Sequence, residues 1–262
     1  MDLGLTGKRA LVLGSTKGIG RGIAEALAAE GARVAVTGRD AAAARATASE
    51  IADKTGAEVA GYGADLMDAA QARALGDAVA ADMGGVDIMV NNGGGPPPGS
   101  VAGLSDDVWS AQFQSMFLSQ VALTNAFLGA MRERGWGRVL VTASSGAVQP
   151  IPNLGISNTL RAALMNWAKT LAGEVAADGV TVNTILPGRI HTARVDRIDV
   201  ASAERQGKSV ADIVRASKAN IPAGRYGTVE EYASVAVFLV SECAGYLTGS
   251  VIRVDGGFIR AT

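Results

Sequence analysis

Seven short apolar runs alternate with longer helix-compatible segments, and this alternation constrains the fold more than any other feature of the chain. Each run is nearly continuous in Val, Leu, Ile and Ala, as strands are when helices cover both faces of their sheet. A repeating strand–helix order with right-handed crossovers builds a parallel sheet. The sequence therefore predicts an α/β fold with helices on both faces of the sheet. The runs are RALVL (9–13), RVAVT (33–37), AEVAGY (57–62), DIMVN (87–91), RVLVTA (138–143), TVNTIL (181–186) and SVIRV (250–254).

Helical segments fill the spaces between these runs, for example residues 18–32, 41–56 and 106–135. The Gly/Pro cluster GGGPPPGS (93–100) follows a strand and is interpreted as a loop, so no linker divides residues 1–262 and we expect one domain. A polar, helix-compatible insertion at about 194–224 interrupts the rhythm before the last helix and strand. It is a candidate substrate lid, with a solvated surface helix as the alternative.

Charge and cysteine content exclude several classes of function. The 24 basic and 25 acidic residues give a net charge of -1 and are scattered, which indicates neither a nucleic-acid nor a membrane partner. No apolar run is long enough to span a membrane. The single cysteine, Cys243, cannot form an internal disulfide; we expect it to be a small buried residue of a cytoplasmic protein. One histidine, His191, leaves little material for a metal site, and none is expected.

A glycine-rich turn, GSTKGIG (14–20), follows the first strand and opens the first helix. Glycines there allow the backbone to approach a pyrophosphate closely, and a helix N-terminus offers free N–H groups and a favourable dipole. The spacing alone is weak in a chain with 34 glycines, but its strand–turn–helix context indicates a dinucleotide site.

With this turn, the whole chain resembles the short-chain dehydrogenase/reductase family. The resemblance implies a Rossmann-type fold with a seven-stranded sheet, a nicotinamide cofactor, a small-molecule substrate and a homodimer or homotetramer. The apolar helix 116–131 supports the last point, since it needs cover beyond its sheet-facing side. The family's other motifs occur in order as ADL (64–66), NNGG (91–94), NTILPGRIHT (183–192), GRYGTVEE (224–231), and YLTG (246–249) with DGG (255–257).

The cofactor-binding residues follow from these motifs by resemblance. His191, in the loop where the family contacts nicotinamide, is interpreted as a loop-stabilising residue and not as a base. The expected cofactor contacts are Gly14, Ser15, Thr16, Lys17, Gly18, Ile19, Gly20, Arg39, Asp65, Leu66, Asn92, Gly93, Gly94, Pro187, Gly188, Ile190 and Thr192.

The residue after the second strand bears on cofactor choice. NAD-preferring enzymes of this fold place an acidic residue there for the ribose hydroxyls, whereas this chain has Arg39. A guanidinium suits a phosphate, and Lys17 adds a second positive charge, so the sequence favours NADP(H) over NAD(H). Asp40 complicates this reading, because it could turn toward the ribose.

The family's catalytic positions are altered in this chain. The family has a serine after the fifth strand, a tyrosine thirteen residues later, a lysine four beyond that, and an asparagine in the fourth helix. Ser144 matches the serine, but Ser157 stands at the tyrosine position, Arg161 at the lysine position and Met116 at the asparagine position. By sequence, Tyr62 and Tyr226 are the nearest tyrosines, and nothing places either hydroxyl in the vacant position.

These changes weaken proton transfer. A serine hydroxyl is a far weaker acid than a phenol, and Arg161 offers only hydrogen-bond donors, although it can stabilise an oxyanion. The first hypothesis is an NADP(H)-dependent oxidoreductase with the altered site Ser144, Ser157 and Arg161. The second is a non-catalytic NADP(H)-binding sensor or partner protein. The third is dehalogenase-like, non-redox chemistry. A simple loss of function, with a solvated Arg161, is the plainest alternative.

Overall fold

A single seven-stranded parallel sheet organises the computed structural model, which describes residues 2–260. Its order is β3-β2-β1-β4-β5-β6-β7, so the α/β prediction is confirmed. Strands β1 to β3 are added toward one edge of the sheet and β4 to β7 toward the other, so the connections diverge at the carboxyl ends of β1 and β4, where this fold class binds ligands. The strands are β1 (Arg9–Val12), β2 (Arg33–Gly38), β3 (Val59–Gly63), β4 (Ile88–Asn91), β5 (Gly137–Thr142), β6 (Val180–Pro187) and β7 (Val251–Val254).

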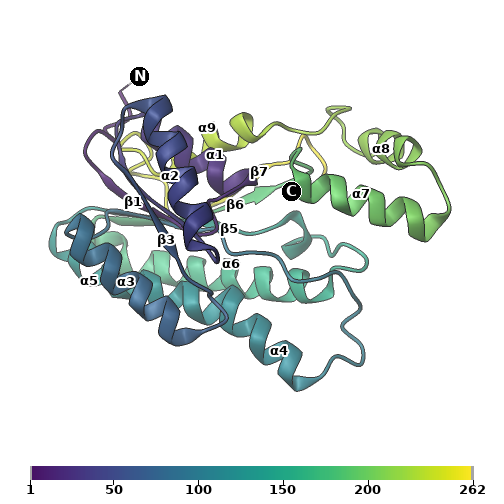
Figure 1. The fold of residues 1–262 in the computed structure, drawn as a ribbon, viewed down its shortest axis with the longest axis horizontal. Coiled ribbons are helices and arrows are strands. Elements are labelled where there is room, and N and C mark those ends of the chain that lie inside the picture. Colours follow the sequence, from purple (N-terminus) through teal and green to yellow (C-terminus); the bar gives the residue numbers. More distant parts are fainter. Residues whose placement is uncertain (1, 261–262) are drawn as a thin grey trace.

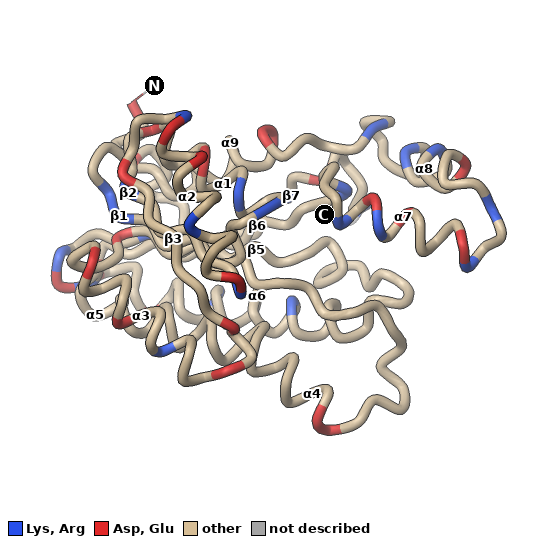
Figure 2. The backbone as a smooth tube through the Cα atoms, viewed as in Figure 1, with Lys and Arg blue, Asp and Glu red and all other residues tan. Residues whose placement is uncertain are grey.

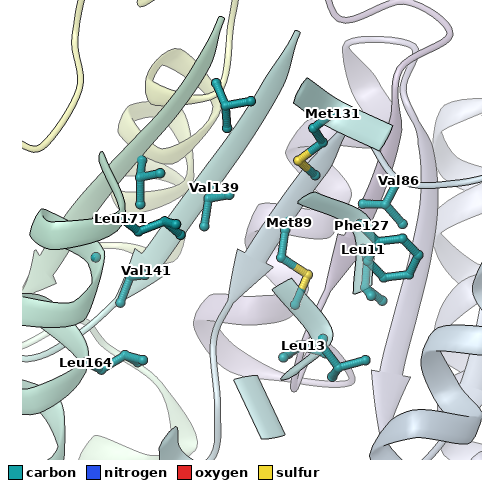
Figure 3. Packing of buried hydrophobic residues seen from close by; sticks show 14 of the residues in the cluster. Leu11, Leu13, Val86, Met89, Phe127, Met131, Val139, Val141, Leu164 and Leu171 are labelled. Carbon is teal, nitrogen blue, oxygen red and sulfur yellow. The ribbon is translucent and has the colours of Figure 1, made fainter. Parts of the chain in front are cut away.

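Helices cover both faces of this sheet (Figure 1). On one face lie α1 (Gly18–Ala29), α2 (Ala41–Thr55) and α9 (Val229–Leu239), and on the other lie α3 (Ala69–Met83), α5 (Ser119–Glu133) and α6 (Gly155–Val175). Successive strand residues serve opposite faces: Leu11 packs toward α3 and α5, and Val12 toward α1. The cores on both faces are therefore apolar; Figure 3 shows the one that contains Met89, Phe127 and Leu164.

The segment 106–135, expected as one helix, is divided by a π-helical turn. It comprises α4 (Asp106–Phe113), the π-turn η1 (Gln114–Leu118) and α5. Met116, in the middle of the π-turn, packs against Ile156 and Leu160 near the start of α6. A π-bulge redirects side chains locally and is frequent at functional sites.

The insertion 194–224 is helical. It contains α7 (Ala193–Gln206) and α8 (Val210–Ala219), which project beyond the sheet at the β7 side (Figure 1). Charges of both signs are interspersed along them (Figure 2). Short 3-10 turns, η2 (Ser145–Ala147) and η3 (Ala176–Asp178), complete the described elements.

Two sequence expectations need correction at the surface. Strand β3 is only half-buried and β7 is partly exposed, because both are edge strands with one neighbour each. Cys243 is exposed and not buried, since it lies in the turn after α9, where its thiol donates to the Asp2 carbonyl. No helix within residues 2–260 is long and apolar enough to cross a bilayer.

Candidate active site

The glycine-rich turn lies at the carboxyl end of β1, next to the carboxyl end of the adjacent strand β4. The Asn92 amide, after β4, donates to the carbonyls of Leu13 (3.1 Å) and Gly14 (3.2 Å) after β1. Gly14 has a φ of 59°, and a Cβ there would lie 2.5 Å from the Asn92 carbonyl oxygen. A Cβ on Gly20 would collide with the Gly14 carbonyl and the Asn92 amide. The two strand ends can thus meet only with glycine at both positions.

The first turn of α1 leaves its amide groups free for an anion. Its N-cap residue, Lys17, makes no side-chain hydrogen bond to the helix, whereas Asp40, Asp68 and Thr228 cap α2, α3 and α9. Uncapped N–H groups at a helix N-terminus bind phosphate oxygens. The residues of this turn therefore fit the pyrophosphate of a dinucleotide cofactor.

Ser15 holds this turn from inside. It is fully buried, its hydroxyl donates to the Val12 carbonyl (2.7 Å), and it accepts from the Thr37 amide (2.8 Å). Ser15 thus ties β1 to β2, and its side chain lies away from the exposed surface of the turn. Thr16, by contrast, lies against Gly38, at the end of β2.

Arg39 and Lys17 are exposed beside this turn, and within residues 2–260 no ion pair engages either side chain. Asp40 is occupied: its carboxylate accepts from the amides of Ala42 (2.8 Å) and Ala43 (3.1 Å) as the N-cap of α2. The complication that Asp40 posed for cofactor choice is therefore reduced, because turning toward a ribose would uncap the helix.

The remaining predicted cofactor contacts line the carboxyl edge of the sheet. Asp65 and Leu66 follow β3, and the Leu66 carbonyl accepts from Ser119 (2.7 Å). Gly93 and Gly94 follow β4. Pro187 ends β6; beyond it Ile190 is buried and Thr192 is the N-cap of α7, where it approaches Gly18 of the glycine turn.

The four catalytic positions, of which three are altered, lie around the start of α6. Ser144 follows β5, and its Oγ accepts from the Gly146 amide (3.1 Å), which leaves its proton available to a ligand. Ser157, in the first turn of α6, is buried, with 8 % of its surface exposed. Met116, in the π-turn η1, packs against Ile156 and Leu160 on either side of position 157 in the sequence. The structure thus brings these positions into one neighbourhood.

Arg161 is a buried cation that bonds to backbone. Its guanidinium donates to the Thr142 carbonyl (2.5 Å) at the end of β5 and to the Gly93 (2.8 Å) and Gly94 (3.4 Å) carbonyls beyond β4. Only 7 % of the residue is exposed, which contradicts the alternative of a solvated arginine. Burial, assisted by repulsion from Arg194, lowers the pKa of Arg161 to about 10, so it stays charged at neutral pH.

Three residues near Arg161 were missed by the sequence analysis. Tyr232 on α9 is fully buried, its hydroxyl donates weakly to the Ile185 carbonyl (3.4 Å), and burial raises its pKa. Tyr232 interacts electrostatically with Arg161, but its hydroxyl is not accessible to solvent. The second residue is Gln120 and the third is Arg194. For Tyr232 and Gln120, the only signal in the sequence was a polar group on the apolar face of a helix, α9 and α5 respectively.

The Gln120 side chain bonds to the backbone of Met116, one helical turn earlier. Its Nε2 donates to the Met116 carbonyl (2.7 Å), and its own Oε1 is buried without a partner. The side chain fills the space under Gly93, where a Cβ would lie 2.5 Å from the Gln120 amide nitrogen. The Met116 carbonyl therefore already accepts one hydrogen bond from a side chain, for which a relay water would have to compete.

His191 lies against Asp196 and not at the catalytic positions. Its Nε2 is 3.2 Å from Asp196 on the first turn of α7, and its amide donates to the Gly227 carbonyl (2.9 Å). This geometry fits the interpretation of a loop-stabilising residue. Within the described part of the chain, no cluster of three His, Cys, Asp or Glu side chains could hold a metal ion.

Comparison with known proteins gives consistent results. Residues 14–259 match the family model described as "Enoyl-(Acyl carrier protein) reductase". A 3-oxoacyl-(acyl-carrier-protein) reductase of Aquifex aeolicus is 37 % identical over 98 % of this chain and 99 % of its own. A D-beta-hydroxybutyrate dehydrogenase of Cupriavidus necator is 34 % identical over 97 % and 99 % of the two chains. The crystal structure of L-sorbose reductase from Gluconobacter frateurii, complexed with NADPH and L-sorbose, is 33 % identical and superposes over the full length of both chains with a TM-score of 0.94.

Proposed function

The chain belongs to the short-chain dehydrogenase/reductase family, and from this premise we propose that it is a cytoplasmic, NADP(H)-dependent oxidoreductase that acts on a carbonyl or alcohol substrate. The observation that carries the choice of cofactor is the uncapped start of α1 beside the unpaired Lys17 and Arg39. The NADPH complex of the related L-sorbose reductase supports it.

When bound, NADP(H) supplies or accepts the hydride, and the chain's own residues polarise the substrate. Ser144 can donate its proton to a carbonyl oxygen, since its hydroxyl accepts from the Gly146 amide and no hydrogen bond within residues 2–260 uses its O–H. Ser157 is a weak acid, so the proton comes from water or the substrate. Arg161 acts through space, because a fixed charge in a low-dielectric site stabilises a developing oxyanion. We propose that the loop 93–99, residues 148–154 and the segment 194–224 line the substrate pocket.

A binding titration followed by a carbonyl panel tests this proposal. NADPH fluorescence is titrated with the protein, and NADPH oxidation is then followed with ketones, aldehydes and oxo acids. Slow turnover of at least one carbonyl supports the oxidoreductase. Tight NADPH binding without hydride transfer to any member would favour the non-catalytic binding protein. Two observations are consistent with that alternative: Arg161 bonds to backbone carbonyls, and the Met116 carbonyl accepts a hydrogen bond from Gln120.

Cofactor preference gives the first quantitative prediction. We expect NADPH to bind at least tenfold more tightly than NADH, about 1.4 kcal/mol, because a 2′-phosphate can pair with Arg39 and Lys17. Arg39→Ala should remove most of that difference and leave NADH affinity unchanged. Fluorescence titration of both cofactors measures it, with Arg45→Ala on α2 as the control. Equal affinities in the wild type would contradict the preference.

Assembly gives the second prediction. Val108, Phe113 and Leu118 are exposed large apolar residues along α4 and η1. Phe113 also stacks on Phe117 at 5.0 Å. An apolar stripe of this kind needs a partner, and we propose a homodimer or homotetramer packed through these helices. Light scattering at micromolar concentration should give a dimer or larger, and Phe113→Glu should dissociate it. A monomeric wild type would refute the assembly.

A further inference from the structure

Arg194, in the first turn of the lid helix α7, lies over the loop that follows β4. Its guanidinium rests on Gly95, so closely that a Cβ at this position would collide with Cζ and both terminal nitrogens at once. Similar approach to all three atoms means that the flat group lies across the backbone of the loop. The residue is solvent-exposed, yet desolvation by surrounding protein lowers its pKa. The Arg194 side chain is thus accessible to a ligand and at the same time partly desolvated by the protein.

Two positive charges therefore meet at this loop. Arg161 bonds to the carbonyls of Gly93 and Gly94 from beneath, and Arg194 covers Gly95 from the lid side. Desolvation and then repulsion from Arg194 lower the pKa of Arg161, and desolvation and then repulsion from Arg197 lower the pKa of Arg194. Among residues 2–260, no carboxylate forms an ion pair or hydrogen bond with Arg161 or Arg194.

The two acidic residues nearest to Arg194 in the sequence, Asp196 and Asp199, contact other groups. Asp196 pairs with His191 at 3.2 Å. Asp199, almost fully buried, accepts from Arg189 (2.7 Å) and from the Tyr226 hydroxyl (2.8 Å). Neither can neutralise Arg161 and Arg194 without losing these contacts, so the surroundings of the loop after β4 have an excess of positive charge.

The two arginines have different capacities for a ligand. Three of the N–H groups of Arg161 are used by backbone carbonyls and the side chain is buried. No hydrogen bond to protein engages the Arg194 guanidinium in the described part of the chain. Its planar fork matches the two oxygens of a carboxylate, and the buried charge of Arg161 strengthens attraction for an anion from behind.

We propose that Arg194 binds a carboxylate of the substrate, so that the enzyme acts on oxo acids or hydroxy acids and not on neutral carbonyl compounds. The inference rests on the proposed function and deepens it. It narrows the substrate class to compounds with an anionic group at the lid end of the pocket and the reacting carbonyl near Ser144. The same chemistry could serve a cofactor phosphate, and the experiment below separates the two sources.

Calorimetric titration of the protein loaded with NADP⁺ tests this without requiring turnover. The probes are 3-oxobutanoate, 4-oxopentanoate and 3-oxohexanoate, each paired with its neutral methyl ester. In the wild type at least one acid should bind about tenfold more tightly than its ester. Arg194→Ala should abolish this difference, with ester binding and NADPH affinity changed less than about twofold. Arg197→Ala removes the same charge from the same helix one turn on, and should leave the preference intact.

A second variant separates position from charge. Gly95→Ala keeps every charge but displaces the Arg194 guanidinium, and should weaken acid binding as Arg194→Ala does. Acid and ester of equal affinity in the wild type, or no binding of any acid, would overturn the proposal. A loss of NADPH affinity in Arg194→Ala would assign the arginine to a cofactor phosphate instead. Acid binding without hydride transfer to any carbonyl would leave the anion site standing while the oxidoreductase proposal failed.

Discussion

Replacing Ser157 by Tyr, Arg161 by Lys and Met116 by Asn together is expected to raise the turnover of ketone reduction by about 10² or more. The wild type should reduce ordinary ketones slowly or not at all, because it has no positioned acid of adequate strength. The triple variant restores a phenol beside an ammonium and an amide near it, which together supply a proton to the developing alkoxide. Stopped-flow or steady-state NADPH oxidation measures the gain.

The geometry favours the triple variant over any single change. Residue 116 packs against Ile156 and Leu160, so it neighbours the helix turns that carry positions 157 and 161. A lysine at 161 can still donate to the Thr142 carbonyl, which keeps the end of β5 anchored. Each single change should yield much less than the triple, because residues that act as a unit are non-additive.

Two controls make the result interpretable. Met116→Asn places an amide in an apolar cluster and should cost about 1–3 kcal/mol of stability on its own, so urea unfolding of each variant must accompany the kinetics. Ser144→Ala within the triple variant should remove most of the gain. A folded triple variant that binds NADPH and reduces nothing faster than the wild type would mean that the pocket lacks space for a productive carbonyl.

The fold was predictable because its signals are local and repeated. Most strands are runs such as RVAVT, with apolar residues on both faces. The glycine turn indicates that two backbone segments approach more closely than any residue with a Cβ would allow. Gly14 and Gly20 contact Asn92 from a distant part of the sequence, yet both ends of that contact lie in recognisable motifs. Seven strands in the expected order followed from these features.

The altered site was less predictable because its partners are distant in sequence. Position 161 showed that a cation was present, but the carbonyls it bonds to belong to residues 93, 94 and 142. Tyr232 has an apolar neighbourhood on α9 that gives no hint of proximity to α6. The sequence showed Arg194 only as part of a polar segment, because its position over Gly95 depends on where α7 lies relative to the loop after β4.

Arg161→Met is expected to lower the free energy of unfolding by about 2–4 kcal/mol. Three carbonyls at the ends of β4 and β5 lose their donor, and an unsatisfied buried carbonyl costs about 1–3 kcal/mol. Relief of the desolvated cation, which no carboxylate neutralises within residues 2–260, offsets part of this loss. Urea unfolding of the protein without cofactor measures the change. Arg197→Met, an exposed arginine on α7 given the same substitution, should shift stability by no more than about 0.5 kcal/mol.

The sign of this result bears on why the chain has an arginine there. A destabilised Arg161→Met variant would mean that the guanidinium holds the ends of β4 and β5 together through its hydrogen bonds. Any electrostatic effect on the substrate would then be a consequence of that structural position. A variant as stable as the wild type would contradict the structural role, because the desolvation cost would then equal the gain from all three hydrogen bonds. In that case a simultaneous loss of oxo-acid binding would identify the buried charge itself as the property that the site requires.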